Sequence, residues 1–155
     1  MCGSHADANG VGAPGTCVTR VACPLCAELD PESVLWEDAY CRVIDVGDPD
    51  YPGYCRVIWN AHVREMSDLA DSSRTHLLTV VCGVERVLRD LLNPDKINLA
   101  SLGNQVPHVH WHVIPRFADD PHFPDSIWAA RRRTATPRPI DPAVLVRELS
   151  RKLPR

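Results

Sequence analysis

The sequence contains no apolar run that approaches the roughly 18 residues expected of a membrane-spanning helix. Its N-terminus lacks the apolar core of a secretion signal. It also lacks an excess of charge of either sign, because 17 Lys and Arg residues nearly balance 20 Asp and Glu residues, for a formal net charge of -3. We therefore expect a cytoplasmic protein that has neither a membrane nor a nucleic acid as its partner.

A regular cysteine framework is missing as well. The seven cysteines are odd in number and irregularly spaced, which argues against a disulfide-stabilised fold in a chain without an export signal. We expect most of these thiols to be reduced. Cys41, Cys55 and Cys82 each lie within an apolar pattern and are expected to be small residues of the core.

The length of 155 residues suits a single domain that is large enough to bury a core. Residues 1–20 are rich in Gly, Ala and small polar residues without a hydrophobic period, and we predict a flexible N-terminal tail there. Residues 21–117 carry the regular patterns and are predicted to form the domain. Residues 118–155 are predicted to be a C-terminal extension with a short helix.

The hydrophobic pattern of the domain changes between strand-like and helix-like periods. Apolar residues at steps of three and four predict an amphipathic helix from about Ser72 to Leu92. Asp71 or Ser72 is the expected N-cap, and Pro94 ends the pattern. Strand-like runs flank this helix at residues 34–38, 39–46, 54–62, 96–103 and 104–117. This order predicts an α+β fold in which a long helix packs on a mostly antiparallel five-stranded sheet.

The C-terminal extension is irregular and rich in proline before its last segment. Asp141 and Pro142 are residue types favoured at the N-cap and first position of a helix, so a short terminal helix is expected. Trp128 and Phe123 are expected to dock on the domain's own surface, although the segment is also a candidate lid or dimer element. The basic run 131–133 is expected to be solvated or mobile, with a phosphate contact as the alternative.

The segment "CPLC" places Cys23 and Cys26 at a spacing that lets both thiolates reach one metal ion. The same spacing suits a redox pair, but the strand before and helix after such a pair are missing here. Zinc is therefore favoured, provided that two further ligands exist. His62 and one histidine of the stretch 108–112 are the candidates.

The stretch "HVHWH" places His108, His110 and His112 at alternate positions, so an extended strand carries all three rings on one face. Two arrangements are open. In the first, all three histidines bind one catalytic zinc whose fourth position is left for water. In the second, one of them joins the two cysteines and His62 in a closed site, and two imidazoles remain for chemistry.

These motifs resemble a known family. The stretch "HVHWHVI" matches the alternating histidine signature of the histidine triad (HIT) superfamily of nucleotide hydrolases and transferases. "CPLC" resembles the N-terminal zinc pair of bacterial members, and "NAHVREMSDL" and "LGNQVPHVHWHVIPR" resemble two further family segments. The resemblance covers residues 21–117 and implies a HIT-like fold. The stretch up to Trp128 is similar to C-terminal extensions of bacterial members described as diadenosine tetraphosphate hydrolases.

In that family the middle histidine attacks the α-phosphorus of a nucleotide, which implies that His110 is the nucleophile. A neutral imidazole is available for this role at physiological pH. His112 is then placed to donate to a phosphate oxygen or to the leaving group, and the expected intermediate is a nucleotidyl-histidine. His108 resembles the fourth zinc ligand of bacterial members, with a phosphate contact as the alternative. The implied structural zinc site is Cys23, Cys26, His62 and His108.

The resemblance also implies substrate contacts and an assembly. Asp45 lies near where family members hold the ribose hydroxyls with an acid, and a carboxylate accepts well from a diol. Asn104 stands where many relatives carry glutamine, and Asn98 is a candidate for a phosphate or nucleophile contact. A homodimer is implied.

The expected activity is cleavage of the α-phosphate bond of dinucleoside polyphosphates or nucleoside phosphoramidates. A zinc-dependent hydrolase that uses the three histidines as catalytic metal ligands is one alternative, and a noncatalytic nucleotide-binding module is another.

Overall fold

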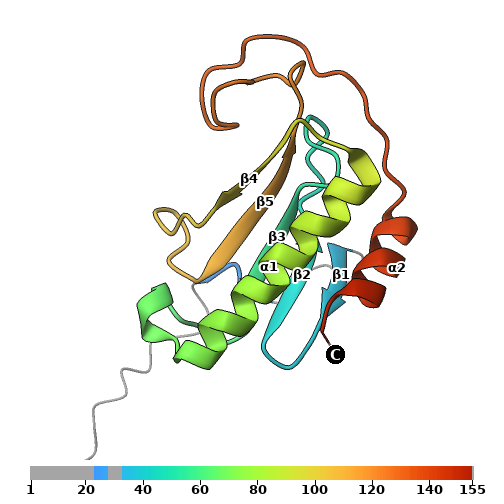
Figure 1. Cartoon of the computed structure of the whole chain (residues 1–155). Coiled ribbons are helices and arrows are strands. Elements are labelled where there is room, and N and C mark those ends of the chain that lie inside the picture. Colours follow the sequence, from blue (N-terminus) through green and yellow to red (C-terminus); the bar gives the residue numbers. More distant parts are fainter. Residues whose placement is uncertain (1–22, 28–32, 155) are drawn as a thin grey trace, which may run out of the picture.

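A computed structural model of the chain describes residues 23–27 and 33–154. The predicted flexible tail, residues 1–20, lies outside the described residues. Figure 1 shows the order of the elements. They are β1 (Val34–Glu37), β2 (Cys41–Asp45), β3 (Cys55–Trp59), the 3-10 helix η3 (Met66–Asp68), α1 (Asp71–Leu92), β4 (Lys96–Ala100), β5 (His110–Arg116) and α2 (Pro142–Lys152).

The five strands form one sheet in the order β1-β2-β3-β5-β4. Every neighbouring pair is antiparallel, so the predicted α+β fold with a five-stranded antiparallel sheet and a long helix is confirmed. The first three strands form an antiparallel meander. Strand β5 lies between β3 and β4, which places its histidines in the interior of the sheet and leaves β4 at an edge.

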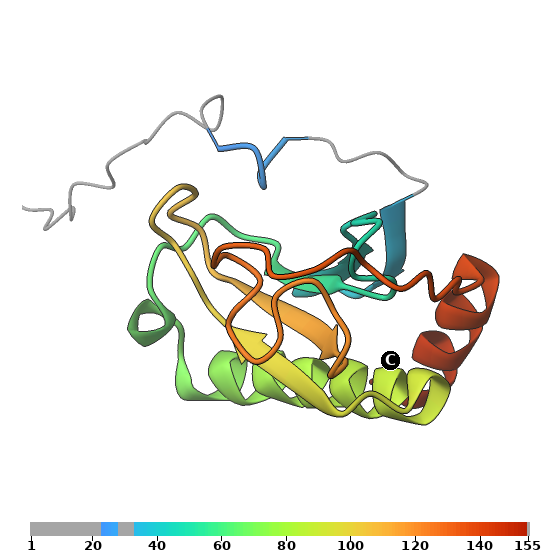
Figure 2. The same ribbon diagram turned by 90° about the horizontal axis from the view of Figure 1, so that it is seen from above.

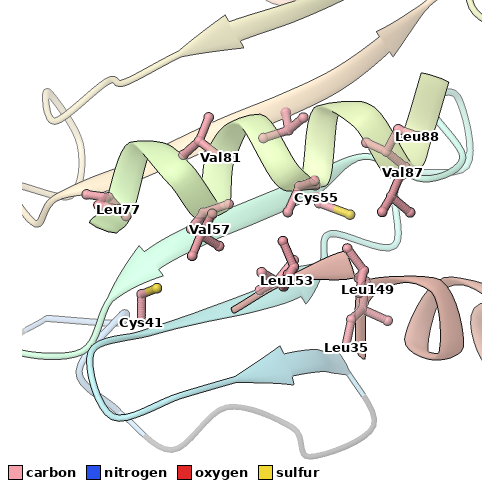
Figure 3. Close-up of a cluster of buried hydrophobic side chains, with 14 of the residues drawn as sticks. Leu35, Cys41, Cys55, Val57, Leu77, Val81, Val87, Leu88, Leu149 and Leu153 are labelled. Carbon is pink, nitrogen blue, oxygen red and sulfur yellow. The ribbon is translucent and has the colours of Figure 1, made fainter. Parts of the chain in front are cut away.

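Strand alternation divides the side chains between two faces of the sheet. On β3, Cys55 and Val57 belong to the main core with α1, whereas Ile58 packs in a separate cluster with Leu25. Successive strand residues point to opposite faces, so Arg56 shares the face of Ile58. Figure 3 shows α1 side chains meeting β3, β2 and α2 side chains in the main core. Helices therefore cover one face of the sheet, and loops lie over the other face.

Helix α1 follows the predicted pattern but starts differently. The N-cap is Ala70, and no side chain bonds to the free amides there, so the predicted cap at Asp71 or Ser72 is wrong. Asp71 instead lies in the first helical turn and pairs with Arg74, where a negative charge suits the helix dipole. The C-cap is Asn93 in the left-handed conformation, with φ of 45°.

Helix α2 docks beside α1 and completes the main core. The Asp141 carboxylate accepts from the Ala143 amide at 2.9 Å, as the predicted cap requires. Leu149 and Leu153 are buried against α1 (Figure 3), and a Cβ at Gly83 would collide with the Leu153 side chain. Among the described residues, no helix is long and apolar enough to cross a membrane.

The cysteine predictions for the core are right at two positions and wrong at one. Cys41 and Cys55 are fully buried, but Cys82 is exposed. The buried positions of α1 include Val81, Gly83 and Val84, so Cys82 falls on the outer side of the helix. The apolar residues around Cys82 in the sequence therefore did not predict correctly whether its side chain points into the core.

The coil between β5 and α2 crosses the face of the sheet away from α1 (Figure 2). A buried ion pair begins it, because Arg116 Nε donates to Asp120 Oδ2 at 2.6 Å and both side chains are 2% exposed. The three arginines of the basic run are exposed, as expected of a solvated segment, and each of them has a partner within the chain. Arg131 pairs with Asp50, Arg132 pairs with Asp125, and Arg133 donates to backbone carbonyls of the coil.

Candidate active site and metal cluster

A cavity of about 350 Å³ lies over β3 and β5 on the side of the sheet away from α1. Its floor comes from these two strands, and its walls come from three loops. The segment 23–27 contributes one wall, the β4–β5 connection a second, and the C-terminal coil a third. The lining residues are Leu25, Arg56, Leu102, Asn104, Gln105, Val106, His110, His112 and Trp128.

His110 is held in one tautomer by the backbone. Its Nδ1 lies 2.6 Å from the carbonyl oxygen of His108, and a carbonyl only accepts, so Nδ1 carries the hydrogen. The lone pair of the neutral ring is then on Nε2. Burial, assisted by the charge of Arg56, lowers the pKa of His110 below its usual value, which favours the neutral ring.

His112 lies beside His110 with 4.9 Å between ring centroids. Burial, together with His110 and Arg56, lowers the pKa of His112 to about 4. Its Nδ1 is hydrogen-bonded to the Tyr54 hydroxyl, and burial raises the pKa of Tyr54, so the phenol keeps its proton. Trp128 meets the His112 ring edge to face at 5.4 Å, which places the coil against the two histidines.

A second group of side chains meets at the other end of the histidine row. One ligand atom from each of Cys23, Cys26, His62 and His108 lies within 4.8 Å of the others. His108 Nδ1 is 3.4 Å from both sulfurs, and His62 Nδ1 is 3.2 Å from that of Cys26. The predicted ligand set is thus brought together from three separate segments of the chain.

The donor set and its tautomers fit a zinc ion. His108 Nε2 lies 2.6 Å from the Trp59 carbonyl, so Nε2 carries the hydrogen and Nδ1 offers a lone pair to the cluster. Tetrahedral zinc with ordinary bond lengths separates a sulfur and a nitrogen ligand by about 3.5 Å. The observed separations of 3.2 to 3.4 Å are close to that value. Two cysteines with two histidines are a common structural zinc set.

The metal cluster and the cavity share a wall. The Cys26 and Ala27 amides both donate to the Cys23 carbonyl, which closes a tight turn. The turn presents Leu25, which is 6% exposed and lines the cavity. Arg42 donates to the Leu25 carbonyl at 2.5 Å and so attaches the turn to β2.

The three histidines of the row do not form a metal-binding group among the residues that the structure describes. Only one other group of suitable side chains is found in that part of the chain, namely Asp38, Cys41 and His76. There the Asp38 carboxylate already accepts from His76 Nε2 at 2.7 Å and from two amides. Burial raises the pKa of the Cys41 thiol to about 12. This network joins the β1–β2 turn to α1.

The predicted substrate contacts divide into those in the cavity and those outside it. Asn104 lies in the lining, as does Gln105. Asp45 does not, because alternation places it on the face of Cys41 and Val43, and its carboxylate accepts from the Gly47 amide at 2.9 Å. Asn98 is also outside the lining, since its side-chain oxygen accepts from Arg116 at 2.6 Å.

Arg56 and Tyr54 were not predicted as site residues. Their signal was present in the strand pattern of "YCRVIW", where Tyr54 and Arg56 alternate with Cys55 and Val57. An arginine in the middle of an otherwise apolar strand faces away from the core and needs a polar environment. Trp128 was expected to dock on the domain surface, and it does so while remaining 52% exposed at the cavity.

Comparison with protein families identifies a HIT domain over residues 28–119. Over 73 residues the chain is 36% identical to "Bis(5'-nucleosyl)-tetraphosphatase [asymmetrical]" of Schizosaccharomyces pombe. Over 81 residues it is 28% identical to "AP-4-A phosphorylase" of Mycobacterium tuberculosis. The aligned segments cover 44% and 48% of this chain, and only 40% and 42% of those two proteins.

Solved structures resemble the whole fold more completely. A histidine triad protein of Bradyrhizobium japonicum is 26% identical, with a TM-score of 0.63 over 81% of this chain and 97% of its own. Another from Marinobacter aquaeolei is also 26% identical, with a TM-score of 0.65 over 77% of this chain and 91% of its own.

Proposed function

The chain belongs to the HIT family, and on that premise we propose that it is a nucleotide hydrolase or transferase with a structural zinc. The bond to be cleaved is that between the α-phosphate of a nucleotide and its leaving group. Dinucleoside polyphosphates and nucleoside phosphoramidates are the substrate classes. The names of the curated relatives, a tetraphosphatase and an AP-4-A phosphorylase, support the first class.

The observation that carries the proposal is the hydrogen bond from His110 Nδ1 to the His108 carbonyl. It leaves the His110 Nε2 lone pair as the nucleophile in a cavity of about 350 Å³. A neutral imidazole whose second nitrogen is fixed by an acceptor is the arrangement that nucleophilic catalysis by histidine requires. No base is needed to activate it.

The reaction proceeds in two displacements. The His110 Nε2 lone pair forms a bond to the α-phosphorus while the bond from phosphorus to the leaving oxygen or nitrogen breaks, and the leaving group departs with that electron pair. A water molecule then attacks the same phosphorus, the phosphorus–nitrogen bond breaks, and the electron pair returns to Nε2. The water proton passes to solvent or to a neighbouring base, and the nucleoside monophosphate is released.

His112 and the neighbouring side chains orient the reacting group. We assign the Tyr54 hydroxyl as the donor in its hydrogen bond with Nδ1. The neutral His112 ring then carries its hydrogen on Nε2 and donates to a phosphate oxygen or to the leaving group. Asn104 and Gln105 offer amide groups to the substrate. The apolar walls, which include Leu25 and Trp128, suit the flat base of a nucleotide.

The zinc is proposed to be structural. Cys23, Cys26, His62 and His108 would hold it, and their fit to the ion rests on the tautomer of His108 and the ligand separations given above. When bound, it supplies a cross-link between the turn 23–27, the segment after β3 and the segment before β5. No step of the proposed reaction passes through it.

The test is His110→Ala, with His76→Ala as a matched control outside the cavity. The substitution removes the atom that bonds phosphorus, so turnover of diadenosine tetraphosphate should fall at least about 1,000-fold. Zinc content and affinity for AMP should change little, because the metal ligands and other phosphate contacts remain. His76→Ala should retain turnover.

Other outcomes of this experiment would support one of the alternative functions. Loss of metal in His110→Ala favours three histidines bound to a catalytic zinc, and unchanged turnover contradicts the nucleophile. A wild-type protein that binds AMP but turns over neither substrate class is a noncatalytic nucleotide-binding module.

We also propose a homodimer through the edge strand and α1. Strand β4 ends the sheet, and exposed leucines lie on and beside it, with Leu99 39% and Leu102 42% exposed. Leu78 on α1 is 40% exposed. An unpaired strand next to exposed apolar side chains favours association with a second copy. Sedimentation of the protein at micromolar concentration should give the mass of a dimer, and a monomer would contradict this assembly.

A further inference from the structure

Arg56 belongs to the floor of the cavity, which β3 and β5 form. It lies on β3 directly across from His112 on β5 in the antiparallel register, and its side chain lines the cavity with His110 and His112. Its position is fixed because β3 and β5 are paired within the sheet, and residues on paired strands are held more rigidly than residues on loops. The guanidinium is therefore built into the site next to the proposed nucleophile.

Arg56 is the only side chain with a permanent charge among the described residues that line the cavity. A guanidinium keeps its positive charge in proteins. The two lining histidines carry a charge only when they are protonated, whereas the guanidinium is charged throughout the physiological pH range. A nucleotide brings negative charge on its phosphates, so this cavity has a single fixed cation to meet it.

The guanidinium also lacks an internal counter-ion. Among the described residues no carboxylate forms an ion pair with Arg56, and its buried Nε has no hydrogen-bond partner. The contrast is Arg116, each of whose three guanidinium nitrogens donates to Asp120, Asn98 or the Asp125 carbonyl. A buried donor without an acceptor is costly unless a ligand completes it.

We propose that Arg56 binds the phosphate chain of the substrate and offsets the charge on the oxygens of the reacting phosphate. This role rests on the proposed function, since it assigns the cation of the same site. Arginine suits it because its planar donors match two phosphate oxygens at once, whereas lysine offers a point charge. Arg56 is thus a substrate-binding residue that distinguishes a nucleotide from its uncharged nucleoside.

The experiment compares AMP with adenosine by calorimetry, because neither ligand is consumed. In the wild type AMP should bind more tightly than adenosine. Arg56→Met should weaken AMP binding roughly 10- to 100-fold and adenosine binding less than about twofold, since only the phosphate loses its partner. Arg56→Lys should recover part of the loss. Arg147→Met, which removes an exposed arginine from α2, should change neither affinity.

The salt dependence provides a second readout. Wild-type affinity for AMP should fall as salt rises, and this dependence should flatten in Arg56→Met while melting temperature and zinc content stay unchanged. Equal losses for AMP and adenosine, or no loss for AMP, would overturn the role of Arg56.

The outcome is separable from that of the proposed function. Turnover of diadenosine tetraphosphate with AMP binding independent of Arg56 defeats only this inference. Charge-selective AMP binding without turnover in the wild type defeats only the enzymatic proposal. A wild type that binds AMP no better than adenosine overturns the phosphate site itself.

Discussion

His108 and His110 stand two residues apart, but the backbone fixes opposite nitrogens in their rings. The Trp59 carbonyl takes the Nε2 hydrogen of His108, which directs the Nδ1 lone pair toward Cys23 and Cys26. The His108 carbonyl takes the Nδ1 hydrogen of His110, which leaves Nε2 for the cavity. His108 with Cys23, Cys26 and His62 thus forms the end of the row suited to the proposed zinc, the metal end. His110 and His112 in the cavity form the end suited to the proposed attack on phosphorus, the phosphate end.

The difference shows that the role of each histidine depends on which ring nitrogen donates to a backbone carbonyl, because the other nitrogen is then left with its lone pair. Both rings are buried, at 1% exposed for His108 and 6% for His110, and burial lowers the pKa of both. Burial therefore does not distinguish them. What differs is which nitrogen is occupied and which partners face the other, sulfur in one case and a cavity with Arg56 in the other.

Cys23→Ser should break the metal end while it spares the histidines of the cavity. Structural zinc contributes an apparent binding free energy on the order of 10 kcal/mol in small domains. We expect the zinc content to fall well below one per chain and the melting temperature to drop by roughly 10 °C or more. AMP affinity should fall as well, because Leu25 on the same turn lines the cavity.

Metal analysis and calorimetric melting measure these changes. Cys82→Ser is the matched control, since Cys82 is exposed on α1 and belongs to no group of possible ligands among the described residues. It should leave zinc content and melting temperature unchanged. A Cys23→Ser protein with full zinc content and full stability would remove this turn from the proposed metal site.

The fold was largely predictable because periodicity reports it directly. Each predicted strand and helix overlaps an observed one, and the cap at Asp141 and the stop near Pro94 hold. Such features depend on residues close in sequence. The N-cap of α1 at Ala70 and the exposure of Cys82 were not predicted, because a cap and the direction of a small side chain depend on the surrounding packing.

The site was only partly predictable for a related reason. A motif fixes residues near each other in sequence, so the histidine row and "CPLC" were recognisable. Asn98 accepts from Arg116 on the neighbouring strand, and Asp45 accepts from the Gly47 amide two residues further on, so both side chains are engaged outside the cavity lining. Arg56 reaches the histidines through strand pairing, a contact that no local pattern contains.

Asp120→Asn should weaken the phosphate end while the metal end stays intact. Burial favours a raised pKa for Asp120, but the Arg116 side chain and three amides hold it at about 2. The substitution leaves Arg116, which is 2% exposed, without its ionic partner. Breaking such a buried pair costs about 3 to 5 kcal/mol. The coil that carries Trp128 should loosen, so AMP affinity should fall with no loss of zinc.

Chemical denaturation, metal analysis and AMP titration test this expectation. Glu148→Gln is the control, because its pairs with Arg147 and Arg151 lie on the surface of α2, where such pairs contribute about 0 to 1 kcal/mol. Equal stability losses in the two variants would show that the Arg116–Asp120 pair does not anchor the coil.

The smallest expected effect is the pH dependence of stability that His112 contributes, which distinguishes the cavity from the metal site. The folded pKa of His112, about 4, lies below its ordinary value of 6.5, so the unfolded chain binds more protons between these values. The free energy of unfolding should therefore fall as the pH drops from about 6.5 to 4, by up to about 3 kcal/mol from this group.

Acid also protonates the metal ligands, but that loss of stability is common to the wild type and the variant His112→Asn. Urea unfolding of both proteins between about pH 7 and pH 4.5 isolates the cavity contribution, because the wild type should lose more stability than the variant. Parallel curves would mean that His112 is not held neutral by its surroundings, and its assignment as a neutral donor beside His110 would have to be abandoned.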